Sequence, residues 1–175
     1  MNRRTALKHI SVAFGSAVAT PTLLSILSSC TEDKAVTPLL FLNTNQALAV
    51  EQLVQFLLPE SDFPGVENLN LLQFTDQMLY HTTSNKEQEL FKLGYNAFNT
   101  VATDDTIKRS KLTEAYFTLN KTKETQLQEL LKLDKDLVPE AQQQDYLIYH
   151  FLTKVRYYCL FGYCTSKAYK EHLLS

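Results

Sequence analysis

The chain is 175 residues long and carries 19 acidic against 17 basic residues, so its formal net charge is −2. An acidic balance with scattered lysines argues against nucleic acid as a partner. Only four glycines are present, and the three after Cys30 lie far apart. The chain therefore lacks the closely spaced glycines of a dinucleotide-binding loop.

Residues 1–29 predict an export signal of the twin-arginine lipoprotein type. Arg3 and Arg4 precede a weakly apolar run, Ile10 to Leu27, which is interrupted by serine, threonine, glycine and proline residues. Such a run makes a poor membrane-spanning helix, whereas the arginine pair resembles a signal used to export proteins that are already folded. The alternative for the two arginines is the charged end of an ordinary secretory signal, and both interpretations place the protein outside the cytoplasm.

Leu27-Ser28-Ser29-Cys30 resembles a bacterial lipobox, in which the cysteine sulfur is acylated and the chain is cut just before it. The alternative is that Cys30 is a thiol within a discarded signal. A cut before Cys30 removes three basic residues and leaves 146 residues with 14 basic and 19 acidic side chains, a net charge of −5. This length fits one domain with a modest core, carried by a periplasmic or cell-envelope lipoprotein.

Residues 30–43 are expected to form a tether between the lipid anchor and the domain. The segment begins with polar and charged residues and ends in the apolar cluster Leu39-Leu40-Phe41-Leu42. This cluster either packs as a short strap on the core or contacts another protein.

Residues 44–175 predict a single irregular all-α bundle of about five to seven helices. No run alternates apolar and polar residues, as a half-buried strand does, for more than a few positions, and glycine-rich hairpin turns are missing. Apolar residues recur at helical spacing instead. The stretches with this spacing are 47–57, 69–79, 90–101, 112–117, 127–133 and 146–158.

Polar residues and prolines mark the helix ends. Asn45 and Asn120 predict N-caps, and Ser84, followed three residues later by a glutamate, predicts a capping box. Pro139 opens the last segment, whose aromatic residues leave few polar gaps, so we expect it to be the central and most buried helix. The polar stretch 134–145 is expected to be a solvated connection between helices.

The loop after the first helix is defined by proline and glycine. Pro59 must end that helix, because proline cannot donate to the helical ladder and disfavours helical geometry in the residue before it. Pro64-Gly65 predicts a type II turn in which the glycine adopts a positive φ. The loop is either a rigid connector or a docking surface, and in the second case we expect Phe63 to point outward.

No pattern in the chain predicts a catalytic, cofactor-binding or metal site. The histidines of the mature chain stand singly, and no serine sits in a glycine-flanked elbow. Covalent haem needs two cysteines with an adjacent histidine, which Cys159 and Cys164 do not provide. These two cysteines could form a disulfide, which requires the helix to break near Gly162, or remain as separate thiols.

Several short motifs occur in a characteristic order: the twin-arginine start, Phe56-Leu57-Leu58-Pro59, Pro64-Gly65-Val66, Leu72-Gln73-Phe74-Thr75-Asp76 and Phe161-Gly162-Tyr163-Cys164-Thr165-Ser166. Together they resemble the gluconate 2-dehydrogenase subunit 3 family over residues 47–166. Members are small exported proteins that accompany a flavin-dependent sugar or alcohol dehydrogenase of the glucose-methanol-choline type. The resemblance implies a non-catalytic accessory subunit that assists export, assembly or membrane association, with FAD in the large subunit and haem in a cytochrome c subunit.

Four residues that match family positions, together with Phe63 beside the turn, are candidates for contact with the dehydrogenase. Cys164 departs from the family, because members often have a second tyrosine there, and the chain stops sooner after Ser166 than many members do. A stand-alone lipid-anchored binding or scaffold protein therefore remains the alternative. Tyrosines of the last segment could form an exposed surface if the chain is an accessory subunit, and they would be core residues if it is a stand-alone protein. The candidate contacts are Phe63, Pro64, Gly65, Gly162 and Tyr163, and the tyrosines are Tyr146, Tyr149, Tyr157, Tyr158 and Tyr163.

Overall fold

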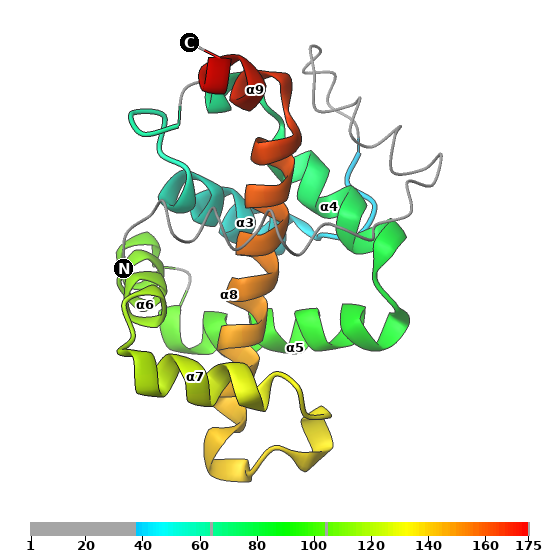
Figure 1. Ribbon diagram of the computed structural model, residues 1–175. Helices are drawn as coiled ribbons and strands as arrows, with labels where there is room; N and C mark the ends of the chain where they lie inside the picture. The colour runs from blue at the N-terminus through cyan, green and yellow to red at the C-terminus, as the bar shows by residue number, and fades with distance from the viewer. Residues whose placement is uncertain (1–37, 64, 104, 175) are drawn as a thin grey trace.

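The computed structural model describes residues 38–63, 65–103 and 105–174, and in these ranges it contains seven α-helices and no strand (Figure 1). The predicted all-α bundle is confirmed. The helices are α3 (Thr44–Leu57), α4 (Leu71–Thr82), α5 (Asn85–Ala102), α6 (Thr106–Phe117), α7 (Lys121–Leu130), α8 (Glu140–Thr165) and α9 (Lys167–Leu174). Two short 3-10 helices, η1 (Val66–Asn68) and η2 (Lys135–Leu137), lie in the connections before α4 and before α8.

Side-chain caps begin several of these helices. Ser84 forms the predicted capping box with Glu87, and Asn120 accepts a hydrogen bond from the N–H of Lys123, so both predictions are confirmed. The cap of α3 is Asn43 rather than the predicted Asn45. Asn43 and Gln46 exchange side-chain to backbone hydrogen bonds of 3.0 Å in each direction, which makes a second capping box.

Helix α8 is the central helix of the bundle, as the aromatic pattern after Pro139 predicts. It packs against α3, α4, α5, α7 and α9, and Figure 1 shows it running through the whole length of the molecule. Phe151, Leu152 and Val155 near its middle are fully buried. The solvated connection predicted for residues 134–145 is shorter than expected, because α8 already begins at Glu140.

The crossing of α5 and α8 is the largest contact between two helices in the described chain. A Cβ built on Gly94 of α5 would lie 2.6 Å from the backbone oxygen of Leu147, so only glycine allows the two helices to approach this closely. Beside this point the rings of Phe91 and Phe98 lie 5.1 Å and 5.3 Å from the ring of Phe151. These offset and edge contacts fill the centre of the core.

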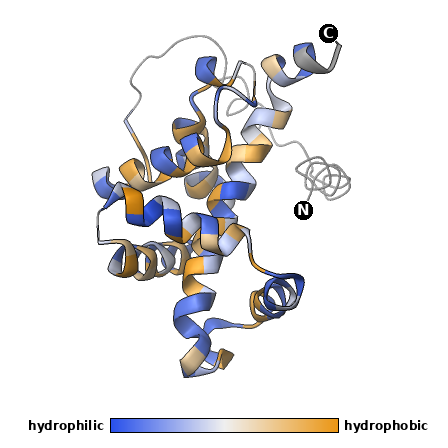
Figure 2. Ribbon diagram, turned by 90° about the vertical axis from the view of Figure 1, so that its left-hand side faces the viewer, coloured by the Kyte–Doolittle hydropathy of each residue, from blue (hydrophilic) through white to orange (hydrophobic). Residues whose placement is uncertain are grey.

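A second apolar cluster joins α7 to the first turns of α8. Its buried members are Leu127, Leu130, Val138, Tyr146 and Tyr149. Hydrophilic and hydrophobic residues are mixed along α8 throughout its length (Figure 2). Among the helices that the structure describes, none combines the length and the apolar run that a membrane crossing needs.

Candidate partner interface

Three motif stretches that are far apart in the sequence meet at one corner of the fold, which we call the motif corner: the loop 58–69, the first turns of α4 and the last turns of α8. The ring of Phe63 lies 5.4 Å from that of Tyr163, in an edge-to-face arrangement. The ring of Phe74 in α4 lies 5.8 Å from that of Phe161 in α8. The motifs therefore share a location, and they reach it by packing against one another.

Gly65 forms the predicted turn. Its φ is 81° and its ψ is 0°, the values of the third residue of a type II turn, and the N–H of Val66 donates to the oxygen of Phe63 at 3.2 Å. A Cβ on Gly65 would also lie only 2.6 Å from the Cβ of Ala168 in α9. Both the backbone conformation and the close approach of α9 thus require glycine here. Pro64 lies outside the described residues.

Phe63 does not have the outward direction that the docking interpretation of the loop expects. The side chain is half-buried and packs against the main core, instead of pointing outward, because Tyr163 offers it a ring edge. Gly162 and Tyr163 are themselves buried. A Cβ on Gly162 would lie 2.8 Å from Phe74 and 2.9 Å from Leu71, so this glycine sets the close contact between α8 and α4. In the described chain, these two residues offer no surface to a partner.

The tyrosines of α8 are mostly core residues. Tyr146, Tyr149, Tyr158 and Tyr163 are buried, whereas Tyr157 is 45% exposed. Of the five tyrosines, only Tyr157 contributes to an exposed surface on this helix.

Cys159 and Cys164 are free thiols in the structure. Helix α8 runs without interruption to Thr165, so the break near Gly162 that a disulfide needs does not occur. Cys159 is fully buried with its Sγ 3.9 Å from Oγ1 of Thr75, and burial raises the pKa of its thiol to about 12. A thiol protonated at this level is a poor nucleophile, so Cys159 serves packing.

Asp76 is a buried residue that sequence reasoning did not single out, although it ends one of the family motifs. Its carboxylate is fully buried in α4 and accepts hydrogen bonds from the backbone N–H groups of Leu40, Phe41 and Leu42, at 2.7, 3.0 and 2.8 Å. We call this the Asp76 clasp. It holds the apolar cluster 39–42 on the core as the expected strap, with Leu42 buried. The sequence did contain a signal for this contact, because Asp76 is an acidic residue within the apolar pattern of α4. A buried carboxylate needs hydrogen-bond donors, so such a position predicts a contact with backbone or side-chain donors.

A second buried polar group ties three helices together. Arg109 of α6 is 4% exposed and donates to Oε1 of Gln52 in α3 at 3.0 Å and to Oδ1 of Asn99 in α5 at 2.8 Å. Asp105 caps α6 and thereby places Arg109 in the first turns of this helix. Arg109 therefore links α6 to α3 and α5, and its guanidinium is not exposed to solvent.

His150 lies in the first half of α8, and its side chain is half-buried. Burial, and secondarily the positive charge of Lys154, lowers the pKa of its imidazole to about 4. Glu87 opposes this shift and forms an ion pair with Lys154 at 3.1 Å. The imidazole of His150 therefore stays neutral at pH 7. In the part of the chain that the structure describes, no cluster of histidines, cysteines and carboxylates could hold a metal ion.

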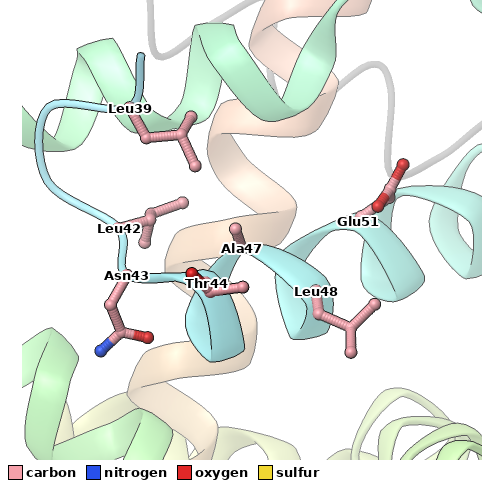
Figure 3. A pocket seen from close by; sticks show the side chains of 7 residues that line it. All are labelled: Leu39, Leu42, Asn43, Thr44, Ala47, Leu48 and Glu51. Carbon is pink, nitrogen blue, oxygen red and sulfur yellow. The ribbon is translucent and has the colours of Figure 1, made fainter.

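An open apolar hollow lies between the strap and the first turns of α3. It has a volume of about 550 Å³, and Figure 3 shows Leu39 and Leu42 on one side of it and the residues of α3 on the other. The lining is mostly apolar and carries one charged residue, Glu51. The residues of the predicted signal and lipidation site, Arg3, Arg4 and Cys30, lie outside the described residues.

A comparison with family models matches residues 44–175 to gluconate 2-dehydrogenase subunit 3. No curated protein and no solved structure gave a match. The family match covers the whole helical domain, including the motif corner and the Asp76 carboxylate. The chain therefore belongs to the gluconate 2-dehydrogenase subunit 3 family.

Proposed function

We propose that this chain is a non-catalytic accessory subunit of a flavin-dependent sugar or alcohol dehydrogenase of the glucose-methanol-choline type. It assists the export, assembly or membrane association of that enzyme. The observation that carries the proposal is the family match over residues 44–175. The arrangement of the polar groups supports it, because Asp76, Arg109 and Cys159 are each engaged in holding helices or the strap together.

The proposal assigns the cofactors to other subunits. FAD belongs to the large dehydrogenase subunit and haem to a cytochrome c subunit, and the present chain contributes a protein surface and a membrane anchor. The anchor is an acyl group on Cys30 after removal of residues 1–29, and the chain works in the periplasm or cell envelope. The twin-arginine signal of this chain would then also serve a folded, flavin-loaded partner that has no signal of its own.

The test is co-expression of the full chain with a flavoprotein encoded beside it. We expect the two to purify together, and we expect exported, flavin-loaded and active flavoprotein to appear only when this chain is present. Absorption at the flavin bands and dye-linked dehydrogenase activity in the envelope fraction are the measurements. Purification of the chain alone from its native envelope, together with normal export of the flavoprotein without it, would favour the stand-alone scaffold instead.

A further inference from the structure

The point at which the tether joins the domain is fixed. The Asp76 clasp holds three consecutive backbone N–H groups of the strap, so the chain enters the domain at a defined place beside the first turn of α3. Seven residues, 31–37, separate Cys30 from Pro38. Even fully extended, this connection spans only about 28 Å. A lipid on Cys30 therefore brings the strap and the start of α3 close to the bilayer.

The side of α3 that faces away from the core is poor in charge. Its six exposed residues include one charged side chain, Glu51, and two large apolar ones, Leu48 at 50% and Phe56 at 39% exposure. The exposed residues are Thr44, Asn45, Leu48, Glu51, Gln55 and Phe56. The surface helix α7, by contrast, has four charged residues among ten. A helix with one charge in 14 residues is unusual for a chain whose mature form has a net charge of −5.

Apolar groups continue on both sides of Leu48. The open hollow beside the strap is lined by Leu39, Leu42, Ala47 and Leu48 itself (Figure 3). On the α6 side, Nε2 of Gln52 donates to Oγ1 of Thr106 at 3.1 Å, and the next residue, Ile107, is 67% exposed. We call this surface the α3 face: Leu48, Phe56, Ile107 and the hollow.

We propose that the α3 face rests on the lipid surface that holds the acyl anchor. The inference depends on the proposed lipidation of Cys30 and adds which side of the domain meets the bilayer. Apolar side chains gain free energy at the boundary between headgroups and acyl chains, whereas charged groups lose hydration there. Because the mature chain is acidic, most of its surface carries charged groups that lose hydration at a bilayer, and a face with one acidic group is better suited to approach lipid.

The absence of tryptophan from the sequence makes a direct test practical. Leu48→Trp and Phe56→Trp each place one fluorophore on the α3 face, and Leu137→Trp places one on η2, an exposed position (70%) beyond the α7 end of α8. Each full chain is produced with its own signal, purified with its acyl group and reconstituted into vesicles of phosphatidylethanolamine and phosphatidylglycerol. Brominated phosphatidylcholine is then included to quench any tryptophan that reaches the acyl region.

We expect emission at positions 48 and 56 to shift to the blue and to fall at least about twofold with brominated lipid, because interfacial side chains lie 5–10 Å into the bilayer. Position 137 should be unaffected. Two outcomes would overturn the inference while supporting the anchor. In the first, the protein floats with the vesicles but positions 48 and 56 are not quenched. In the second, position 137 is quenched as strongly as positions 48 and 56. Failure to float would remove the anchor and the inference together. A blue shift at 48 and 56 that appears only with added flavoprotein would assign the face to that partner and also overturn it.

Discussion

At the scale of single residues, the chain uses its buried polar groups to connect segments. Asp76 joins the strap to α4, and Arg109 joins α6 to α3 and α5. Both groups have their hydrogen-bonding partners on other elements, so each one specifies a tertiary contact in addition to stabilising it. The residues of the family motifs likewise act mainly in packing within the domain.

Replacing Asp76 by asparagine should release the strap. An amide has one acceptor oxygen and presents an NH₂ group to the remaining N–H donors, so at least one buried donor loses its partner. We expect the free energy of unfolding to fall by roughly 3 kcal/mol. Urea unfolding followed by circular dichroism measures this, with the exposed Glu114→Gln as the matched control. Equal stability of the two variants would show that the Asp76 clasp is not holding the strap.

His150 should make the protein sensitive to mild acid. The pKa of its imidazole is about 4 in the folded chain and about 6.5 when unfolded, so the unfolded state binds the proton first and stability falls as the pH drops from about 6.5 to 4. The loss should reach roughly 2–3 kcal/mol at the low end of this range. Chemical unfolding at several pH values is the measurement.

The variants for this prediction are His150→Gln and His81→Gln. The first should flatten the stability profile between pH 6.5 and 5, before carboxylates begin to titrate, whereas the second changes an exposed histidine and should keep the slope. An unchanged slope in His150→Gln would assign the acid sensitivity to other groups.

At the scale of elements, the motif corner shows how loop, α4, α8 and α9 define one another. Gly65 allows the turn to pass Ala168 of α9, and Gly162 allows α8 to approach α4. Phe63 and Tyr163 fill the space between them. The packing of this loop agrees with its interpretation as a rigid connector, although Glu60, Ser61 and Asp62 within it are exposed.

Gly65→Ala should destabilise the domain for two separable reasons. The positive φ costs about 1 kcal/mol, and the contact with Ala168 adds a steric cost. Adding Ala168→Gly should recover the steric part only. A double-mutant cycle built from the three variants should therefore show a favourable coupling of about 1 kcal/mol in thermal or urea unfolding. If the effects of the two substitutions on the free energy of unfolding simply add, α9 moves away from the new Cβ without an energetic cost.

Local chemistry explains why the elements were predictable. The N-caps Ser84, Asn120 and Pro139 affect only the backbone within a few residues of themselves. The turn at Gly65 depends on the φ of that residue alone. The local sequence is therefore enough to predict each of these features. The contacts that were missed join distant segments. Asp76 meets a strap 34 to 36 residues earlier, and the orientation of Phe63 depends on Tyr163, one hundred positions away in the sequence. Hydrophobic spacing indicates that such side chains are inward-facing, but it does not name their neighbours.

At the scale of the whole molecule, the helices form one unit because nearly all of them share α8. None of the described helices is long and apolar enough to cross a membrane. The proposed function assigns membrane attachment to an acyl group on Cys30.

Cys30→Ser should therefore move the protein from the membrane fraction to the soluble fraction without changing the domain. A single acyl chain or pair of chains supplies the membrane affinity, while the melting temperature depends on residues 38–174, which the substitution leaves intact. Fractionation, intact mass and a thermal melt are measured on the same preparations. The same membrane fraction and the same mass in both proteins would remove the lipid anchor from the proposal.

The position of α8 near the end of the sequence also sets the time at which the chain can fold during synthesis. Helices α3 and α4 are complete by Thr82, but the helix they pack against extends from Glu140 to Thr165. At ribosomal rates of about 5–20 residues per second, these first helices wait roughly 4 to 16 seconds for their partner. Folding of the bundle is therefore delayed until translation is nearly finished.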